Sequence, residues 1–375
     1  MNNRVNRPVW VEVDLEKIKY NFKKIKENVS RETLIMAVVK ANAYGHGVIP
    51  VVKKLITAGC DRLAVALPEE GKQIREAGFD QIPIHILGEV LPHQISMLFD
   101  NNLIPTISKL KTIKEINSIA KKKELKKKVH IKIDTGMGRI GIFPKDVLEF
   151  INEIKNLSNI QIEGLMTHFA NADEKDKEYT RKQWNEFVNI ISLLENNNIK
   201  IPLKHVANSA TIMDLPEMEL DMVRPGIMLY GLNPSSEINS NLKLKSALSW
   251  KARIMYLKEV SAGSGISYGT TFVTSKRSKI ATLPLGYADG YSRLLSNKAE
   301  VLIQGKRVPV VGNVCMDQFM VDVSEIKDVN IGDEVVLIGK QKNEEIKATE
   351  LAEIMGTINY EIVCNISDRI PRKYV

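Results

Sequence analysis

From residue 9 onward the chain alternates between short apolar runs and longer segments in which apolar residues recur every three or four positions. The first pattern predicts buried strands and the second predicts amphipathic helices. A first run at residues 9–13 precedes Asp14, which suits the cap of a helix that begins at Leu15. Further strands are predicted at 34–40, 62–67, 83–87, 103–107, 129–133, 161–167, 202–207 and 221–224.

Helical patterns separate most of these predicted strands, for example at residues 69–77, 109–123 and 174–197. Eight strands alternating with helices predict an α/β fold, a (β/α)₈ barrel of the TIM type. A doubly wound open sheet remains an alternative, because a strand count from a single sequence can be wrong by about one strand.

This alternation ends at residues 232–245, a polar stretch rich in Pro, Ser and Asn that we interpret as a linker. The remaining chain is rich in predicted strands separated by turn signals, with one helix expected at 348–356. We therefore predict a barrel domain over residues 1–240, followed by a mainly antiparallel C-terminal β-domain over residues 241–375.

Composition narrows the class of protein. Hydrophobic residues make up 44% of the 375 positions, which supports a large core, and no apolar run is long enough to span a membrane. The N-terminus lacks the apolar segment of a secretory signal, and the three cysteines are far apart without metal-binding spacing. We expect a cytoplasmic protein with no metal site and no membrane partner.

The net charge of +8 is concentrated at residues 121–128, KKKELKKK. No aromatic residues interleave with these lysines, so a solvated helix end is favoured over a nucleic-acid surface.

Lys40 is the first candidate for chemistry, because it follows the apolar run LIMAVV. Burial at a strand tip lowers the pKa of an ammonium group and increases the fraction of neutral amine, which can form a Schiff base with an aldehyde. The alternative is that Lys40 only extends from the strand end into solvent.

A glycine-rich motif, TGMGRIG, occupies residues 135–141 and matches the spacing of dinucleotide-binding loops. Such loops open directly into a helix, whereas here Pro144 is the better helix start. We interpret the motif as a loop that places Arg139, whose fork of donors suits a carboxylate.

Polar residues also follow other predicted strands, and the C-terminal ends of barrel strands share one mouth. Each of these polar residues could instead have a purely structural role, as a histidine hydrogen-bonded in the core, as a helix cap or as one partner of an ion pair. The stretches 207–211 and 224–228 offer a hydroxyl and backbone N–H groups for a phosphate. A Schiff-base lysine beside a phosphate cradle suggests pyridoxal phosphate. The residues of this ring are Lys40, Lys132, Arg139, His168, His205, Asn208, Ser209, Arg224 and Gly226.

Eight sequence blocks resemble those of the bacterial alanine racemase family, in the same order and over nearly the whole chain. Smaller pyridoxal-phosphate-binding proteins share the barrel and the lysine, but they lack the second domain and the SYG and CMDQ blocks. The blocks are AVVKANAYGHG, KIDTGMGRIG, THFANAD, HVANSA, MVRPGIMLYG, GISYGTTF, LPLGYADGYSR and NVCMDQFMVDV.

The resemblance implies a role for each matching residue. Lys40 would hold pyridoxal 5'-phosphate and act as one catalytic base, and Tyr268 would be the other. Arg139 and the backbone of Met316 would bind the substrate carboxylate. The cofactor contacts would come from Tyr44, Ser209, Arg224, Gly226, Ile227 and Tyr360, and the supporting residues would be His168, His205, Lys132, Tyr287 and Asp317.

Further expectations follow from the resemblance. Strand 9–13 would pack with the C-terminal domain, and a homodimer would share each active site, because the second-domain residues come from the neighbouring subunit in this family. Lys132 matches a lysine that is often carbamylated and that orients the arginine.

The expected reaction is the interconversion of L- and D-alanine, which supplies D-alanine for peptidoglycan. Lys40 would exchange the α-proton of the D-enantiomer and Tyr268 that of the L-enantiomer, with Arg139 and His168 as positive neighbours that favour the phenolate. Arg224 would face the pyridine nitrogen and leave it unprotonated. The alternatives are a broad-specificity racemase, a decarboxylase and a non-catalytic pyridoxal-phosphate carrier.

Overall fold

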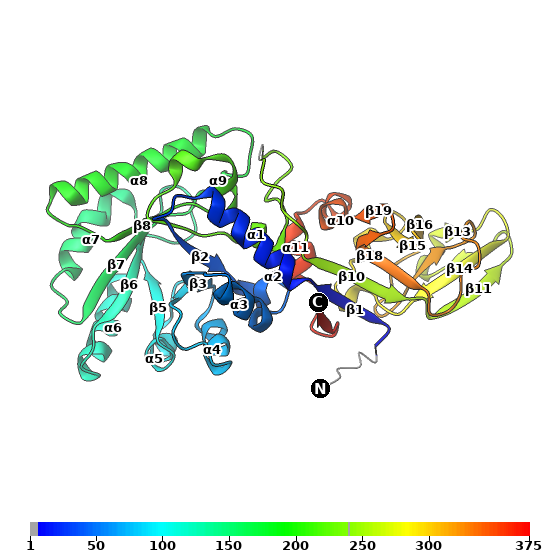
Figure 1. Ribbon diagram of the computed structural model, residues 1–375, viewed down its shortest axis with the longest axis horizontal. Helices are drawn as coiled ribbons and strands as arrows, with labels where there is room; N and C mark the ends of the chain where they lie inside the picture. Colours follow the sequence, from blue (N-terminus) through cyan, green and yellow to red (C-terminus); the bar gives the residue numbers. More distant parts are fainter. Residues whose placement is uncertain (1–6, 239–240) are drawn as a thin grey trace. The chain divides into compact units, whose positions relative to one another are not determined.

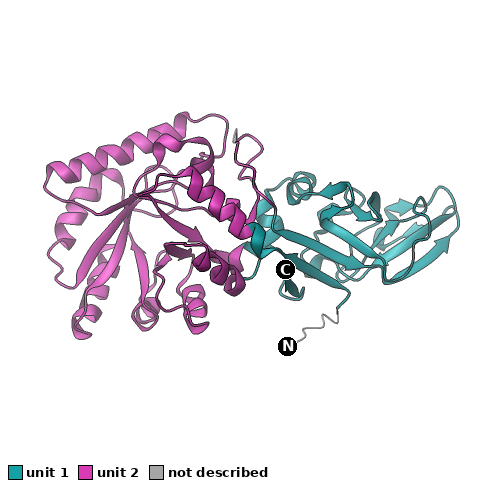
Figure 2. Cartoon of the chain, in the orientation of Figure 1, with its two compact units in different colours: residues 1–17, 44–47, 246–375 teal, residues 18–43, 48–245 magenta. Residues whose placement is uncertain are grey.

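The computed structural model describes residues 7–238 and 241–375, which form two compact units (Figures 1 and 2). The first unit described below contains residues 18–43 and 48–245 and is labelled unit 2 in Figure 2. The second contains the chain up to residue 17, residues 44–47 and residues 246–375, and is labelled unit 1. Each unit is described by itself below. Among the described residues, no helix combines the length and the apolar character needed to cross a membrane.

The first unit is a barrel of eight parallel strands in the spatial order β8-β7-β6-β5-β4-β3-β2-β9. The backbone N–H of Arg224, after β9, donates to the carbonyl of Ala207, after β8, at 2.9 Å. The predicted barrel is thus confirmed, and an open doubly wound sheet is excluded. The strands are β2 Leu34–Val38, β3 Arg62–Val65, β4 Ile84–Ile86, β5 Leu103–Ile107, β6 Lys127–Lys132, β7 Ile160–Met166, β8 Leu203–His205 and β9 Met222–Val223.

Helices surround this sheet on its outer side (Figure 1). The helix predicted after Asp14 is present, and the Asp14 carboxylate accepts from the backbone N–H groups of Glu16 and Lys17. Short helices such as α5 and α9 were not predicted, because six residues are too few to show a helical period. The helices are α1 Leu15–Asn28, α3 Val48–Thr57, α4 Pro68–Glu76, α5 Ile95–Asp100, α6 Leu110–Lys122, α7 Val147–Ile154, α8 Glu178–Asn196 and α9 Ser209–Asp214.

The barrel interior contains a polar layer in addition to its apolar core. Side chains alternate along a strand, so Lys128, His130 and Lys132 share one face of β6. The ring of His130 lies 4.5 Å from that of His85 on β4 and 5.0 Å from that of His205 on β8. Neither strand is a neighbour of β6 in the sheet, so these contacts cross the interior.

The second unit is built on a mainly antiparallel sheet, as predicted, with the order β11-β14-β17-β16-β15-β18-β10-β1-β20. Strand β1 pairs antiparallel with β10 and parallel with β20. The elements are β1 Val9–Val13, β10 Leu248–Arg253, β11 Tyr256–Val260, β12 Gly265–Ile266, β13 Phe272–Val273, β14 Ser278–Leu283, β15 Glu300–Ile303, β16 Lys306–Val311, β17 Phe319–Asp322, β18 Glu334–Gln341, β19 Glu344–Ile346, β20 Arg372–Tyr374, α10 Ala348–Met355 and α11 Asn359–Cys364.

The segment predicted as a linker, residues 232–245, contains no helix or strand in its described part. Residues 239 and 240 of this prediction lie outside the described residues.

Candidate active site

Lys40 lies two residues beyond the end of β2, at the C-terminal end of the barrel strands. The chain then turns through α2, Lys40–Tyr44, with positive φ angles of 51° to 55° at Ala41, Asn42 and Ala43. The backbone is therefore left-handed through this turn. Left-handed backbone costs a non-glycine residue about 1–2 kcal/mol, so its neighbours must hold the turn in place.

Two side chains of the barrel unit hold this turn. Glu70 accepts a hydrogen bond from the backbone N–H of Ala41 at 2.6 Å, and its other oxygen accepts from Ala66 at 2.7 Å. The Asn42 side chain accepts from the backbone N–H of Val48 at 2.8 Å. These bonds fix the strained segment that follows Lys40, and hence the start of its side chain.

A group of cationic side chains acts on the half-buried ring of His168. The positive charges of Arg224, Lys132, Arg139 and Lys40 all act on this ring. Lys132 is 3% exposed and Arg224 is 3% exposed. The barrel therefore gathers four of the predicted basic residues at the same end of its strands, where an anionic ligand would be stabilised.

His168 itself does not carry a charge, which corrects one expectation. Burial lowers the pKa of His168 well below its usual value, and the neighbouring Arg224 lowers it further. Its ring is therefore neutral at pH 7 and cannot be a positive neighbour of a phenolate. Of the two residues expected to play that part, only Arg139 carries the charge.

The guanidinium of Arg224 is held on two sides. Its NH1 group donates to Nδ1 of His205 at 2.8 Å. Its NH2 group lies 2.9 Å from the carbonyls of Thr167 and Val206 and 3.2 Å from Nδ1 of His168. All these partners are neutral acceptors, so the arginine keeps its full positive charge toward a ligand.

Ser209 and Gly226 lie together after β8 and β9. The hydroxyl of Ser209 accepts from the backbone N–H of Gly226 at 2.8 Å, and the short 3-10 helix that begins at Ile227 follows directly. Asn208, rather than Ser209, caps α9 through the backbone N–H of Thr211.

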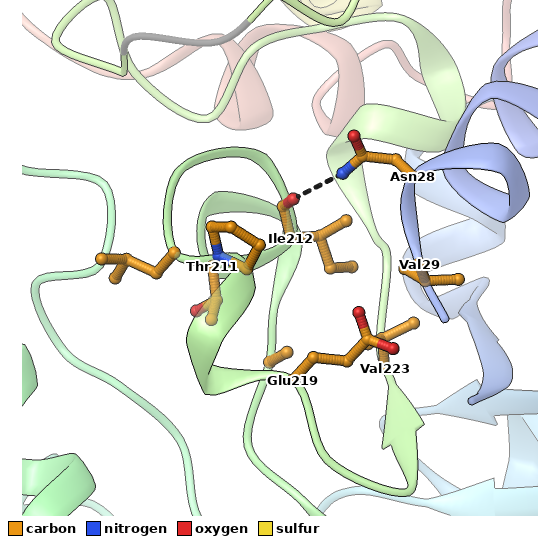
Figure 3. Close-up of a pocket in the computed structure, with 9 residues that line it drawn as sticks. Asn28, Val29, Thr211, Ile212, Glu219 and Val223 are labelled. Atoms are coloured by element: carbon orange, nitrogen blue, oxygen red, sulfur yellow. Dashed lines mark hydrogen bonds between the residues drawn. The ribbon is translucent and has the colours of Figure 1, made fainter. Parts of the chain in front are cut away.

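A small cavity lies behind α9 (Figure 3). Asn28 donates to the carbonyl of Ile212 at 3.1 Å across it. Its volume of about 10 Å³ has room for about one water molecule, so it is not a cofactor site.

The glycine-rich loop is not a dinucleotide site, in agreement with the prediction. The carboxylate of Asp134 accepts from the backbone N–H groups of Gly136 and Gly138, both at 3.0 Å. A carboxylate on these N–H groups excludes a phosphate from the same place. A 3-10 turn begins at Pro144 and leads into α7.

In the second unit, Tyr44 and Tyr360 lie together, with ring centroids 6.1 Å apart. Gly45 allows this approach, because a Cβ atom at this position would lie 2.1 Å from the carbonyl oxygen of Val363 in α11. Its φ of 78° is also one that a residue with a side chain rarely adopts.

Tyr268 follows a strained residue of the second unit. Ser267 has a φ of 66°, and its hydroxyl donates to the carbonyl of Asn313 at 2.6 Å. The Asn313 amide in turn donates to the carbonyl of Tyr268 at 2.6 Å. The phenol side of Tyr268 remains open, with 71% of the residue exposed.

The loop after Asn313 presents the other predicted residues of this unit. Backbone bonds join Tyr287 to Cys315 and Ala288 to Met316, and Met316 is 53% exposed. Asp317 pairs with Arg369 at 2.7 Å.

Sequence reasoning missed the buried residues behind Arg224, chiefly His130 and Glu163. Both are polar or charged residues that alternate with apolar residues in a predicted barrel strand, and this is the signal that could have found them. A polar residue at an interior-facing position of a barrel strand needs a buried partner.

The comparisons with known proteins agree with this arrangement. The sequence model described as the alanine racemase N-terminal domain matches residues 13–234, and that of the alanine racemase C-terminal domain matches residues 247–374. A curated alanine racemase from Halothermothrix orenii is 57% identical over 374 residues, which is 100% of this chain and 98% of that protein.

Solved structures are similar over nearly the full length. The alanine racemase from Bacillus anthracis with bound L-Ala-P has a TM-score of 0.93 and 42% identity, covering 98% of this chain and 95% of that one. The alanine racemase from Bartonella henselae with covalently bound pyridoxal phosphate has a TM-score of 0.89 and 28% identity, covering 98% and 99%. Both domain models and the full-length relatives lead to the same conclusion: the chain belongs to the alanine racemase family.

Proposed function

We propose that this protein interconverts L-alanine and D-alanine with pyridoxal phosphate as its cofactor, and that Lys40 and Tyr268 are its two bases. The observation that carries this proposal is the cation cluster at the mouth of the barrel, in which Arg224 has only neutral partners. Family membership and the covalently bound cofactor of the Bartonella henselae structure support the same reading.

The residues present fit this cofactor. A phosphate dianion suits the hydroxyl of Ser209 and the backbone at Gly226 and Ile227, and the cations at the barrel mouth favour its charge. The guanidinium of Arg224 is a donor only, so it suits an unprotonated ring nitrogen. The hydroxyls of Tyr44 and Tyr360 would complete the phosphate contacts.

When bound, the cofactor withdraws electrons from the α-carbon and makes its proton acidic. The Nζ atom of Lys40 then removes or returns this proton on one face, and the Oη atom of Tyr268 does so on the other. Arg139 holds the substrate carboxylate, which fixes the α-carbon between the two bases. Two bases on opposite faces invert the centre without turning the substrate over.

A homodimer that shares its active sites is part of this proposal. Three residues with expected roles in the second unit are exposed on a single chain: Tyr268 by 71%, Met316 by 53% and Tyr287 by 43%. A base of this kind works best where water is excluded, and a partner subunit would supply that cover. We also place the enzyme in the cytoplasm, where its D-alanine would serve peptidoglycan synthesis.

A racemisation assay tests the proposal. The purified chain with pyridoxal phosphate should convert L-alanine to D-alanine and the reverse, and should act much more slowly on serine, lysine and arginine. Equal rates on all four would indicate a broad-specificity racemase. Release of carbon dioxide would indicate a decarboxylase, and bound cofactor without turnover would indicate a carrier.

Replacing Arg224 by glutamate should change the outcome of the reaction as well as its rate. A carboxylate there would favour a protonated ring nitrogen and a longer-lived carbanion, so racemisation should fall about a hundredfold. A new long-wavelength absorbance with alanine and increased transamination should accompany this loss. Arg224→Lys, which keeps the charge, is the control. An unchanged spectrum in Arg224→Glu would contradict the role of Arg224.

Lys132 should react with carbon dioxide. Its Nζ atom is buried and has no hydrogen-bond partner among the described residues. Burial lowers the pKa of Lys132 well below its usual value, and the charges of Arg224 and Arg139 lower it further, so a larger fraction of this amine is neutral than in an ordinary lysine. A neutral amine adds carbon dioxide and releases a proton, and the carbamate anion would then neutralise its cationic neighbours.

Carbon NMR with ¹³C-labelled bicarbonate checks this prediction, since a carbamate signal should appear and should vanish in Lys132→Met. Lys127→Met is the matched control on the same strand, and the carbamate signal should persist in this variant. Lys127 is also buried, but its Nζ atom donates to the carbonyl of Leu98 at 2.5 Å. A signal that survives Lys132→Met, or no signal in the unchanged protein, would contradict the prediction.

A further inference from the structure

A continuous chain of hydrogen bonds runs through the barrel interior from Arg224 to Glu163. Arg224 NH1 lies 2.8 Å from Nδ1 of His205, and Nε2 of His205 lies 2.7 Å from Nδ1 of His130. Nε2 of His130 lies 3.1 Å from Oε2 of Glu163. These four side chains are buried, with at most 5% of any residue exposed. No proton step of the proposed reaction uses His130 or Glu163.

The two ends of this chain determine the position of every proton between them. A guanidinium only donates, so Nδ1 of His205 carries no hydrogen and its Nε2 carries one. That hydrogen is donated to Nδ1 of His130, so the hydrogen of this second ring is on Nε2 and is donated to the carboxylate. A ring's tautomer is set by the bond that its other nitrogen makes, and here both tautomers are fixed.

No further proton fits into the chain. A second hydrogen on either histidine would place two donors against each other at 2.7 or 2.8 Å. The pKa directions agree with this count, because burial lowers the pKa of both His130 and His205. Burial raises the pKa of Glu163, but hydrogen bonds from His130, Arg62 and Lys128 outweigh it and hold that pKa well below its usual range.

The carboxylate of Glu163, at the acceptor end of this chain of hydrogen bonds, is also held by two donors outside the chain. Arg62 donates to Oε2 of Glu163 at 2.7 Å, and Lys128 donates to Oε1 at 2.8 Å. The ring of His130 packs closely against Gly164 on β7, where a Cβ atom would lie 2.3 Å from its Nδ1. Only glycine at this position leaves room for the ring.

A metal site is the competing interpretation, because ligand atoms of His85, His130 and Glu163 lie within 4.8 Å of one another. Arg62 argues against it. The same NH1 group bonds both the carboxylate and Nε2 of His85, at 2.7 and 3.2 Å. A cation already occupies the position that a metal ion would need.

We propose that Glu163 and His130 are positioning residues for racemisation, because they fix the tautomer of His205 and thereby hold the guanidinium of Arg224 in its orientation toward the cofactor. This inference rests on the proposed function for the role of Arg224. The hydrogen-bond direction itself is a property of the chain alone.

The size of the effect can be bounded. In serine proteases, replacing the carboxylate that orients the catalytic histidine by an amide costs about 10⁴-fold, because the wrong tautomer forms. Here the carboxylate of Glu163 acts through two histidine rings on Arg224, which does not itself transfer the proton. We therefore expect a smaller loss, of about 10- to 100-fold in kcat with little change in KM, by analogy with the loss of a group that orients a metal ligand.

Glu163→Gln is the decisive variant. Its amide offers one oxygen to the three donors from His130, Arg62 and Lys128, and its NH₂ group must face one of them. Glu163→Asp keeps a carboxylate and should recover part of kcat. His85→Phe is the control for general disruption, because His85 is equally buried but lies outside the chain from Glu163 to Arg224.

Nitrogen NMR of ¹⁵N-histidine-labelled protein, with and without cofactor, reads the tautomers directly. The chain has only six histidines, so single replacements can assign them. In the unchanged protein and in His85→Phe, His130 and His205 should both be neutral with hydrogen on Nε2. In Glu163→Gln, at least His130 should change to a mixed or Nδ1-protonated state.

The possible outcomes distinguish a failure of this proposal from a failure of the proposed function. Hydrogen on Nδ1 of His205, or a charged ring, in the unchanged protein would overturn the proposal even if no variant folds. Unchanged tautomers in Glu163→Gln, or equal kcat losses in Glu163→Gln and His85→Phe, would also overturn it. An enzyme that fails to racemise alanine but shows the expected tautomers would refute the proposed function alone.

Discussion

Replacing Lys40 by alanine should abolish racemisation, with a loss of at least about 10⁴-fold in kcat/KM. Lys40 is proposed both to hold the cofactor covalently and to act as one of the two bases, and a single general base alone contributes about 10²- to 10⁴-fold. Steady-state conversion of each alanine enantiomer measures the loss. Both directions should fall equally, because inversion needs both bases.

The control is Lys53→Ala, which removes an exposed lysine of α3 in the same unit and should leave the rate unchanged. The absorbance of covalently held cofactor should also be absent from Lys40→Ala and present in Lys53→Ala. A Lys40→Ala enzyme that retains more than a few per cent of the rate would contradict the assignment.

Replacing Tyr268 by phenylalanine should slow proton exchange about 10²- to 10⁴-fold for one enantiomer only. Lys40 remains in this variant, so the α-hydrogen of D-alanine should still exchange with deuterium from the solvent, while that of L-alanine should not. Mass spectrometry of each enantiomer after incubation in heavy water gives the two rates separately. Net racemisation should be lost with the slower step.

Tyr256→Phe is the matched control, since Tyr256 is also an exposed tyrosine of the second unit, 55% accessible, in β11. It should exchange both enantiomers normally. Equal loss of exchange for L- and D-alanine in Tyr268→Phe would show that the bases are not divided between the two faces.

The barrel was predictable because short strand-like runs, most of them apolar, alternate with helical patterns along the chain. The position of Lys40 beyond such a run follows from the same pattern, and so does the interpretation of Gly136 and Gly138 as a loop. These features depend on local sequence, where burial of an apolar strand dominates.

Other features depend on contacts that sequence does not show. The left-handed turn after Lys40 is made of residues common in ordinary helices, and it is held by Glu70, which lies far along the chain. The neutral state of His168 follows from its burial beside Arg224, so its charge was predicted wrongly. His130 and Glu163 acquire their meaning only when the barrel closes and brings β6, β7 and β8 together.

Borohydride reduction of the purified protein with its cofactor, followed by peptide mapping, tests the central claim most directly. We expect one reduced pyridoxyl adduct, on the peptide that contains Lys40, and loss of activity in proportion to its formation. An adduct on any other lysine, or full activity after complete reduction, would contradict it.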